Sequence, residues 1–193
     1  MAEGSGPAGA GAPKIISLVG LRGSGKSTVG ELLAQELGVP FLDLDHELAE
    51  RFGQDGESAG ELLGRVSEPA FRDFEERALS ACLAADGLRV LATGGGAVLR
   101  PANRSALIDR TYCVWLQADP QELVRRVHGQ NPSVRDESAT TRPPLTDLEP
   151  MQEMEFLAEK RAVHYATVAD LRCATGGRTP KMVAHEIFSK LPQ

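Results

Sequence analysis

The chain has 193 residues, of which 41% are hydrophobic and 25% charged, a composition typical of a single soluble domain. Its formal net charge of −6 argues against the broad basic surface that holds nucleic acid or an anionic membrane. No apolar run approaches the ~20 residues of a membrane-spanning helix, and the first residues lack the charged start and apolar core of a secretory signal.

The cysteines and histidines give no sign of a disulfide framework or a metal site. Cys82, Cys113 and Cys173 are odd in number and far apart, which is typical of reduced thiols in the cytoplasm. The four histidines show no metal-ligand spacing. We therefore expect a cytoplasmic monomer with small-molecule partners, in which residues 1–13 form a disordered tail and residues 14–193 a single domain.

The first predicted elements form a strand–loop–helix unit. Residues 15–19 read IISLV, an apolar and β-branched run typical of a strand buried on both faces. After a glycine-rich loop, apolar residues recur at helical spacing until Gly38, which ends the helix. Residues 41–44 predict a second strand, and Asp45 can cap a short helix that runs to Phe52.

Later segments continue the alternation of helices and strands. Ser58 with Glu61 predicts a capping box, and a longer helix follows Ser67. Strands are predicted at 89–93, 111–116 and 170–175, and helices from 119–120, over 150–168 and from 180 onward. Between about 128 and 146 the periodicity is lost over a length typical of a lid or a disordered segment. The alternation predicts an α/β three-layer sandwich around a central parallel sheet of five strands.

The loop after the first strand has the spacing of a phosphate-binding loop. Gly20 is followed after four residues by Gly25, Lys26 and Ser27, which matches G-x-x-x-x-G-K-[ST]. A chance match in a chain rich in alanine and glycine is the alternative, but the preceding strand and following helix favour nucleotide binding. The residues expected to contact the phosphates are Gly23, Ser24, Gly25, Lys26, Ser27 and Thr28.

Two further stretches follow predicted strands. Asp43 and Asp45 lie at the carboxyl end of the second strand, where ligands of open α/β sheets bind. One carboxylate could support Mg²⁺ and the other accept a proton, although Asp45 could equally be a helix cap only. Gly94–Gly96 follow the third strand, and their exposed N–H groups could bind an anion, with a plain turn as the alternative.

Six motifs in this order resemble the shikimate kinase family. They are GLRGSGKST (20–28), FLDLD (41–45), EPAFRDFE (68–75), TGGGAV (93–98), RPPL (142–145) and EKRAVHY (159–165). The resemblance covers nearly the whole chain from Lys14 onward. It implies a P-loop NTPase of the nucleoside monophosphate kinase type, which transfers the γ-phosphoryl group of ATP to the 3-hydroxyl of shikimate with Mg²⁺ as cofactor, in aromatic amino acid biosynthesis.

On the nucleotide side, the resemblance implies that Lys26 and Ser27 bind phosphates and Mg²⁺ and that Asp43 supports the metal. It also implies that Arg142 closes over the phosphates from a lid at about 128–146. Arg126 is expected near the adenine, and Arg178 belongs to a similar adenine-side loop. From the residues alone, Arg125 competes with Arg126 for the adenine role.

On the acceptor side, the resemblance implies that Asp45 binds the acceptor hydroxyls and acts as the base. Arg72 and Arg161, with the backbone of Gly94, Gly95 and Gly96, would hold the shikimate carboxylate and a hydroxyl. From spacing alone, Arg72 and Glu75 could instead be an ordinary surface ion pair on a helix.

Two other functions remain possible at this point. Another small-molecule kinase, or a nucleoside monophosphate kinase, would need a site for a base and a phosphate, whereas two arginines and a triple glycine suit one carboxylate. A nucleotide-binding regulatory module without catalysis would not need all of Lys26, Asp45 and Arg142.

Overall fold

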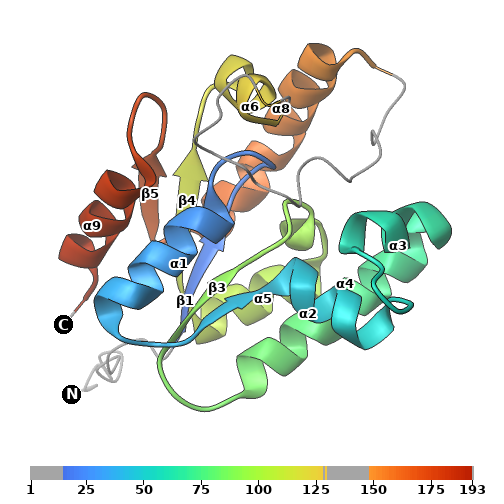
Figure 1. The fold of residues 1–193 in the computed structure, drawn as a ribbon, viewed down its shortest axis with the longest axis horizontal. Helices are drawn as coiled ribbons and strands as arrows, with labels where there is room; N and C mark the ends of the chain where they lie inside the picture. Colours follow the sequence, from blue (N-terminus) through green and yellow to red (C-terminus); the bar gives the residue numbers. More distant parts are fainter. Residues whose placement is uncertain (1–14, 128, 130–147, 193) are drawn as a thin grey trace, which may run out of the picture.

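A five-stranded, fully parallel sheet runs through the centre of the computed structural model (Figure 1). The structure describes residues 15–127, 129 and 148–192; the predicted tail and all of the predicted lid except Gly129 lie outside these residues. The strands lie in the order β2-β3-β1-β4-β5. Their bounds are β1 Ile15–Val19, β2 Phe41–Asp43, β3 Arg89–Ala92, β4 Tyr112–Gln117 and β5 Leu171–Ala174.

The central strand is the apolar run predicted to be buried on both faces. Every residue of β1 is buried, and Ile16 lies between Val90 of β3 and Tyr112 of β4. Because all strands are parallel, the loops that follow β1, β2 and β3 meet at one edge of the sheet. Ligands of such sheets bind at this edge, where neighbouring strands lead to helices on opposite faces.

The helices form two layers around the sheet (Figure 1). On one face, α1 (Lys26–Leu37) and α9 (Pro180–Lys190) pack together over an apolar cluster from β1, β3, β4 and β5. A second cluster fills the other side of the sheet. Its helices are α2 (Leu44–Phe52), α3 (Ala59–Arg65), α4 (Glu68–Ala84), α5 (Pro101–Arg110), α6 (Pro120–Val127) and α8 (Pro150–Val168).

Most predicted helix ends are confirmed. Gly38 ends α1 with φ 68°, Ser58 and Glu61 form the predicted capping box of α3, and Ser67 caps α4. The prediction that Asp45 caps the second helix was wrong. That helix begins two residues earlier than expected, so Asp43 is its N-cap and accepts a hydrogen bond from the N–H of Asp45.

One helix was missed. No helix was predicted between the triple glycine and the next strand, but η1 (Ala97–Leu99) and α5 lie there. Pro101 in the first turn of α5 was the available start signal, whereas its N-cap, Arg100, makes no side-chain capping bond. The helix buries only Asn103 and Leu107, so its apolar pattern is weak.

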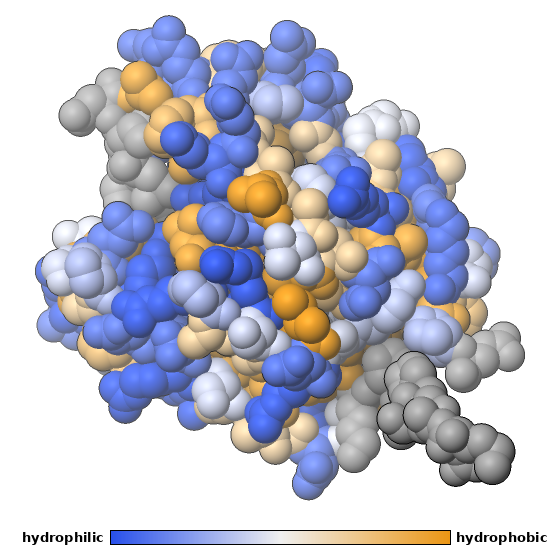
Figure 2. Space-filling view, turned by 180° about the vertical axis from the view of Figure 1, so that it is seen from behind, coloured by the Kyte–Doolittle hydropathy of each residue, from blue (hydrophilic) through white to orange (hydrophobic). Residues whose placement is uncertain are grey.

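The face opposite the view of Figure 1 is covered mainly by hydrophilic residues, with small apolar areas between them (Figure 2). Among the described residues, no helix is both long enough and apolar enough to cross a membrane.

Candidate active site

The glycine-rich loop forms an anion cradle between β1 and α1. Gly25 is the N-cap of α1 with φ 91°, a left-handed conformation that side chains disfavour, so the first N–H groups of the helix open toward the loop. The ammonium group of Lys26 donates hydrogen bonds to the carbonyl oxygens of Gly20 at 3.0 Å and Leu21 at 2.9 Å. Its charge is thus held over the loop, where a bound polyphosphate would lie.

Oxygen atoms suited to a divalent cation lie beside this cradle. The hydroxyl of Ser27 donates to Asp43 Oδ2 at 2.6 Å. Among the described residues, no three His, Cys, Asp or Glu side chains are grouped so that they could hold a metal alone. A hard cation bound through Ser27 and Asp43 would therefore complete its coordination with phosphate and water oxygens, as Mg²⁺ usually does in proteins.

Asp45 lies in the first turn of α2, between this oxygen pair and a small enclosed cavity of about 30 Å³. The cavity is lined by charged side chains and glycines together with the start of the phosphate loop; its members include Leu21, Arg22, Asp45, Arg72, Glu75, Gly95, Gly96 and Arg161. Asp45 thus faces both the site expected for phosphates and the charged lining of this cavity.

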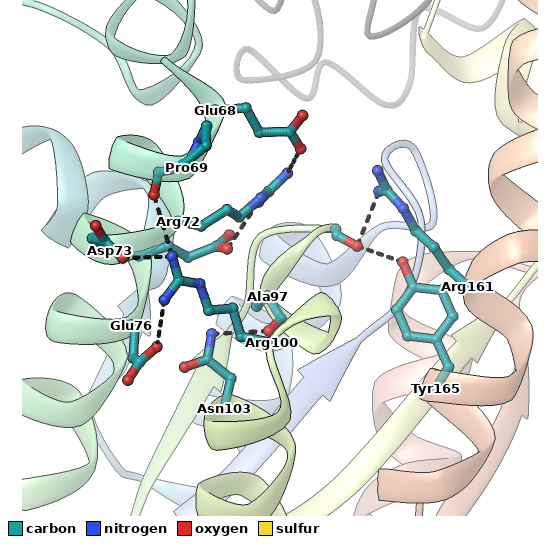
Figure 3. A network of polar contacts seen from close by, with 12 residues as sticks. Glu68, Pro69, Arg72, Asp73, Glu76, Ala97, Arg100, Asn103, Arg161 and Tyr165 are labelled. Carbon is teal, nitrogen blue, oxygen red and sulfur yellow. Dashed lines mark hydrogen bonds and ion pairs between the residues drawn. The ribbon is translucent and has the colours of Figure 1, made fainter. Parts of the chain in front are cut away.

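Two arginines approach the glycine loop after β3 from opposite sides (Figure 3). Arg72 projects from α4 and pairs with Glu75 at 2.8 Å and with Glu68 at 3.4 Å. Arg161 projects from α8 and donates to the carbonyl oxygen of Gly95 at 3.1 Å. Both arginines are nearly buried, with 8% and 7% exposure. Two guanidinium groups around one pocket suit a small planar anion such as a carboxylate.

Glu75 also belongs to the site. From the sequence it was expected only as a possible partner of Arg72 in a surface ion pair. The pair with Arg72 exists, but Glu75 is 1% exposed, so the pair is internal. Burial raises the pKa of Glu75, and the charge of Arg72 acts in the opposite direction. Glu75 holds the Arg72 guanidinium at the wall of the cavity. The available signal was its i,i+3 spacing from Arg72.

The triple glycine allows these charged groups to approach the backbone. A Cβ atom on Gly94 would lie 2.8 Å from Asp45 Oδ1 and 3.0 Å from Glu75 Oε1. A Cβ atom on Gly96 would lie 2.6 Å from Cζ of Arg72. A side chain at either position would displace the groups that line the cavity, which explains the run better than a plain turn does.

On the nucleotide side, Arg126 links the loop after β1 to the loop after β5. Arg126 donates to the carbonyl oxygen of Gly23 at 3.2 Å and to both oxygens of Thr175 at 3.1 and 2.9 Å. Arg125 is largely exposed and pairs with Glu122. The geometry therefore favours Arg126 over Arg125 for a contact beside the phosphate loop. Neither Thr175 nor its link to Arg126 was predicted.

Arg178 follows β5, as predicted, and is tied to its own neighbourhood. Its guanidinium pairs with Glu186 of α9 and donates to the carbonyl oxygen of Ala174 at 3.1 Å. Arg142, the remaining predicted catalytic residue, lies outside the described residues, so its role stays a prediction.

Comparison with known proteins decides the family. The model of the shikimate kinase family matches residues 22–192. The shikimate kinase of Pseudomonas fluorescens (strain Pf0-1) is 40% identical over 178 residues, covering 92% of this chain and 96% of that protein. The chain belongs to the shikimate kinase family.

Solved structures agree with this membership. A shikimate kinase from Acinetobacter baumannii, in complex with shikimate, is similar with a TM-score of 0.78 and 32% identity, covering 93% of this chain and 96% of that one. A gluconokinase from Sinorhizobium meliloti, at 20% identity and a TM-score of 0.59, shares the fold. The predicted fold, a P-loop NTPase of the nucleoside monophosphate kinase type, is confirmed.

The cysteines of this shikimate kinase family member are shielded from solvent. All three are buried and free. Burial raises the pKa of Cys82 to about 11 and that of Cys113 to about 12, so both thiols are protonated at neutral pH.

Proposed function

We propose that the chain transfers the γ-phosphoryl group of ATP to the 3-hydroxyl of shikimate, giving shikimate 3-phosphate and ADP. The observation that carries this proposal is the charged cavity beside the phosphate loop, where Asp45, Arg72 and Arg161 meet. The family membership and the shikimate complex of the A. baumannii enzyme support the choice of acceptor.

In this reaction one group of residues binds the phosphates of ATP, and Asp45 acts on the acceptor. The helix N-terminus and Lys26 bind the phosphates and stabilise the negative charge that develops on the transferred group. Ser27 and Asp43 would hold Mg²⁺, which neutralises phosphate charge when bound. Asp45 accepts the proton of the attacking hydroxyl, because it lines the acceptor cavity and its backbone N–H donates to Asp43 of the Ser27–Asp43 pair.

The acceptor is held by its carboxylate. Arg72 and Arg161 present planar donor groups from opposite sides of the glycine loop, and the fixed fork of a guanidinium matches the two oxygens of a carboxylate. Arg72 forms an ion pair with Glu75, whereas Arg161 has no ion pair with a described acid. We therefore expect the strongest contact to the carboxylate at Arg161, with Arg72 as its partner.

A coupled assay of ADP release across a panel of acceptors tests the function. We expect strong release with shikimate, little with a shikimate analogue whose carboxylate is replaced by an uncharged amide, and essentially none with AMP, CMP or UMP. Without the carboxylate, the two nearly buried guanidinium groups lose their contact with the acceptor, which penalises binding. Faster turnover of a nucleoside monophosphate would reject shikimate as the substrate, and ATP binding without turnover of any acceptor would indicate a regulatory module.

Arg72→Ala should raise the KM for shikimate by ~10-fold or more and that for ATP by less than ~3-fold, because Arg72 lines the acceptor cavity only. Steady-state kinetics with each substrate varied would measure this. Arg77→Ala, which removes an exposed arginine of the same helix, is the matched control. The Arg72→Met/Glu75→Met variant removes both charges and should keep the KM defect while avoiding a stranded carboxylate. A defect confined to ATP would contradict the assignment.

The site residues, a monomeric state and a cytoplasmic location also remain proposals. The buried, unpaired cysteines are compatible with a reducing compartment. Light scattering coupled to size-exclusion chromatography would test the monomer.

A further inference from the structure

The phosphate loop is tied to α8 by an ion pair that the catalytic roles above do not use. Arg22, two residues after Gly20, donates from Nη2 to Oε2 of Glu153 in the first turn of α8. The side chains are 14% and 2% exposed, respectively. The two residues lie 131 positions apart in sequence, so the pair joins two elements that no local interaction would hold together.

The same helix carries the acceptor arginine. Glu153, Leu157, Arg161 and Tyr165 follow at intervals of four residues and are all buried, so they form one stripe along α8. Leu157 and Arg161 line the acceptor cavity, as does Arg22 itself. Tyr165 donates to the carbonyl oxygen of Gly95 at 2.6 Å, the same oxygen that Arg161 contacts. One buried stripe thus connects the phosphate loop with the acceptor site.

We infer that the Arg22–Glu153 pair couples the two substrates: it transmits occupancy of the phosphate loop to Arg161 through α8, so that a bound nucleotide strengthens acceptor binding. The inference rests on the proposed function. Both residues are positioning residues, since they act through the loop and the helix. Reciprocity follows, because a coupling free energy between two sites affects both ligands equally.

Competition for the charge of Arg22 explains how the pair could link the two substrate sites. A phosphate bound at the loop adds negative charge next to Arg22, and this charge competes with Glu153 for the guanidinium. An adjustment of Arg22 would change its contact with Glu153, and Arg161 lies two helical turns farther along the same buried stripe. Gly95 lies beside both groups, because a Cβ on it would be at van der Waals distance from each, 3.5 Å from the N atom of Arg22 and 3.6 Å from Nη1 of Arg161.

Calorimetric titration of shikimate, without and with saturating Mg·ADP, tests the inference. The quantity measured is the ratio of the two shikimate dissociation constants. We expect a ratio of about 5 or more in the parent protein and below about 2 in the R22M/E153M variant. Replacing both charges by methionine avoids an unpaired buried charge, so this variant should fold. Glu153→Gln is the second variant, and it should also lower the ratio.

A second ion pair provides the control. Glu36, at the far end of α1 from the phosphate loop, contacts His185 of α9 at 2.7 Å. The E36Q/H185Q variant should therefore keep the parent ratio. A parent ratio of 1 would overturn the inference, as would an R22M/E153M or E153Q variant that keeps the parent ratio while both dissociation constants shift together. Absence of shikimate binding by the parent protein would instead reject the proposed function, and the coupling with it.

Discussion

Lys26→Ala should lower turnover by ~10³-fold or more while leaving the midpoint of thermal unfolding almost unchanged. The ammonium group contributes to the anion cradle and donates to carbonyl oxygens of its own loop, at 3.0 Å to Gly20 and 2.9 Å to Leu21. Its removal therefore takes away charge stabilisation at the transferring phosphoryl group without opening a cavity in either apolar cluster. Steady-state kinetics and calorimetry would measure both quantities.

Lys190→Ala is the control for the loss of one positive charge. Lys190 is exposed at the end of α9 and pairs with Glu186 on the surface. Its replacement should leave turnover within ~2-fold, because exposed ion pairs contribute little. Near-parental turnover in the Lys26→Ala variant would show that the loop binds nucleotide without taking part in phosphoryl transfer.

Asp45→Asn should lower turnover by ~10²-fold or more and leave ADP binding unchanged, because the amide keeps the size of the carboxylate but cannot accept the hydroxyl proton. The structure sharpens this test. Since Asp43, and not Asp45, caps α2, the substitution does not remove the cap, and the stability of the helix should be retained.

Glu50→Gln provides the matched control on the same helix, since Glu50 is exposed and pairs only weakly with His46 at 3.4 Å. It should behave as the parent protein in turnover and in ADP binding. If Asp45→Asn changes only the unfolding temperature, Asp45 has a structural role and another group must accept the proton.

The parts of the fold that depend on local sequence could be predicted. The all-apolar β1, the glycine-rich loop and the Ser58–Glu61 capping box are each specified within a few residues, so their patterns are visible without a structure. The helix cap at Asp43 was misassigned because both acids of FLDLD are good N-caps, and only the backbone decides which one precedes the first turn.

The parts that depend on distant neighbours could not be predicted. Spacing shows that Arg72 and Glu75 can pair, but not that α4 lies against the sheet and buries them. Likewise, Arg126 and Arg125 are equivalent in the sequence until Thr175, 49 residues later, is brought next to one of them. The Arg22–Glu153 pair is of the same kind, since nothing in the local pattern of either residue points to the other.

The glycine run after β3 also limits how this protein can change. At Gly94 and Gly96, even one added carbon would meet Asp45, Glu75 or Arg72 at less than or about 3 Å. Those contacts are with groups that the proposed reaction uses, so displacing them would disturb the proposed acceptor site. A mutation that enlarges this wall to exclude an inhibitor would therefore also damage the acceptor site. Inhibitors that contact this glycine backbone, rather than side chains that can be substituted, would therefore be hard to evade by mutation.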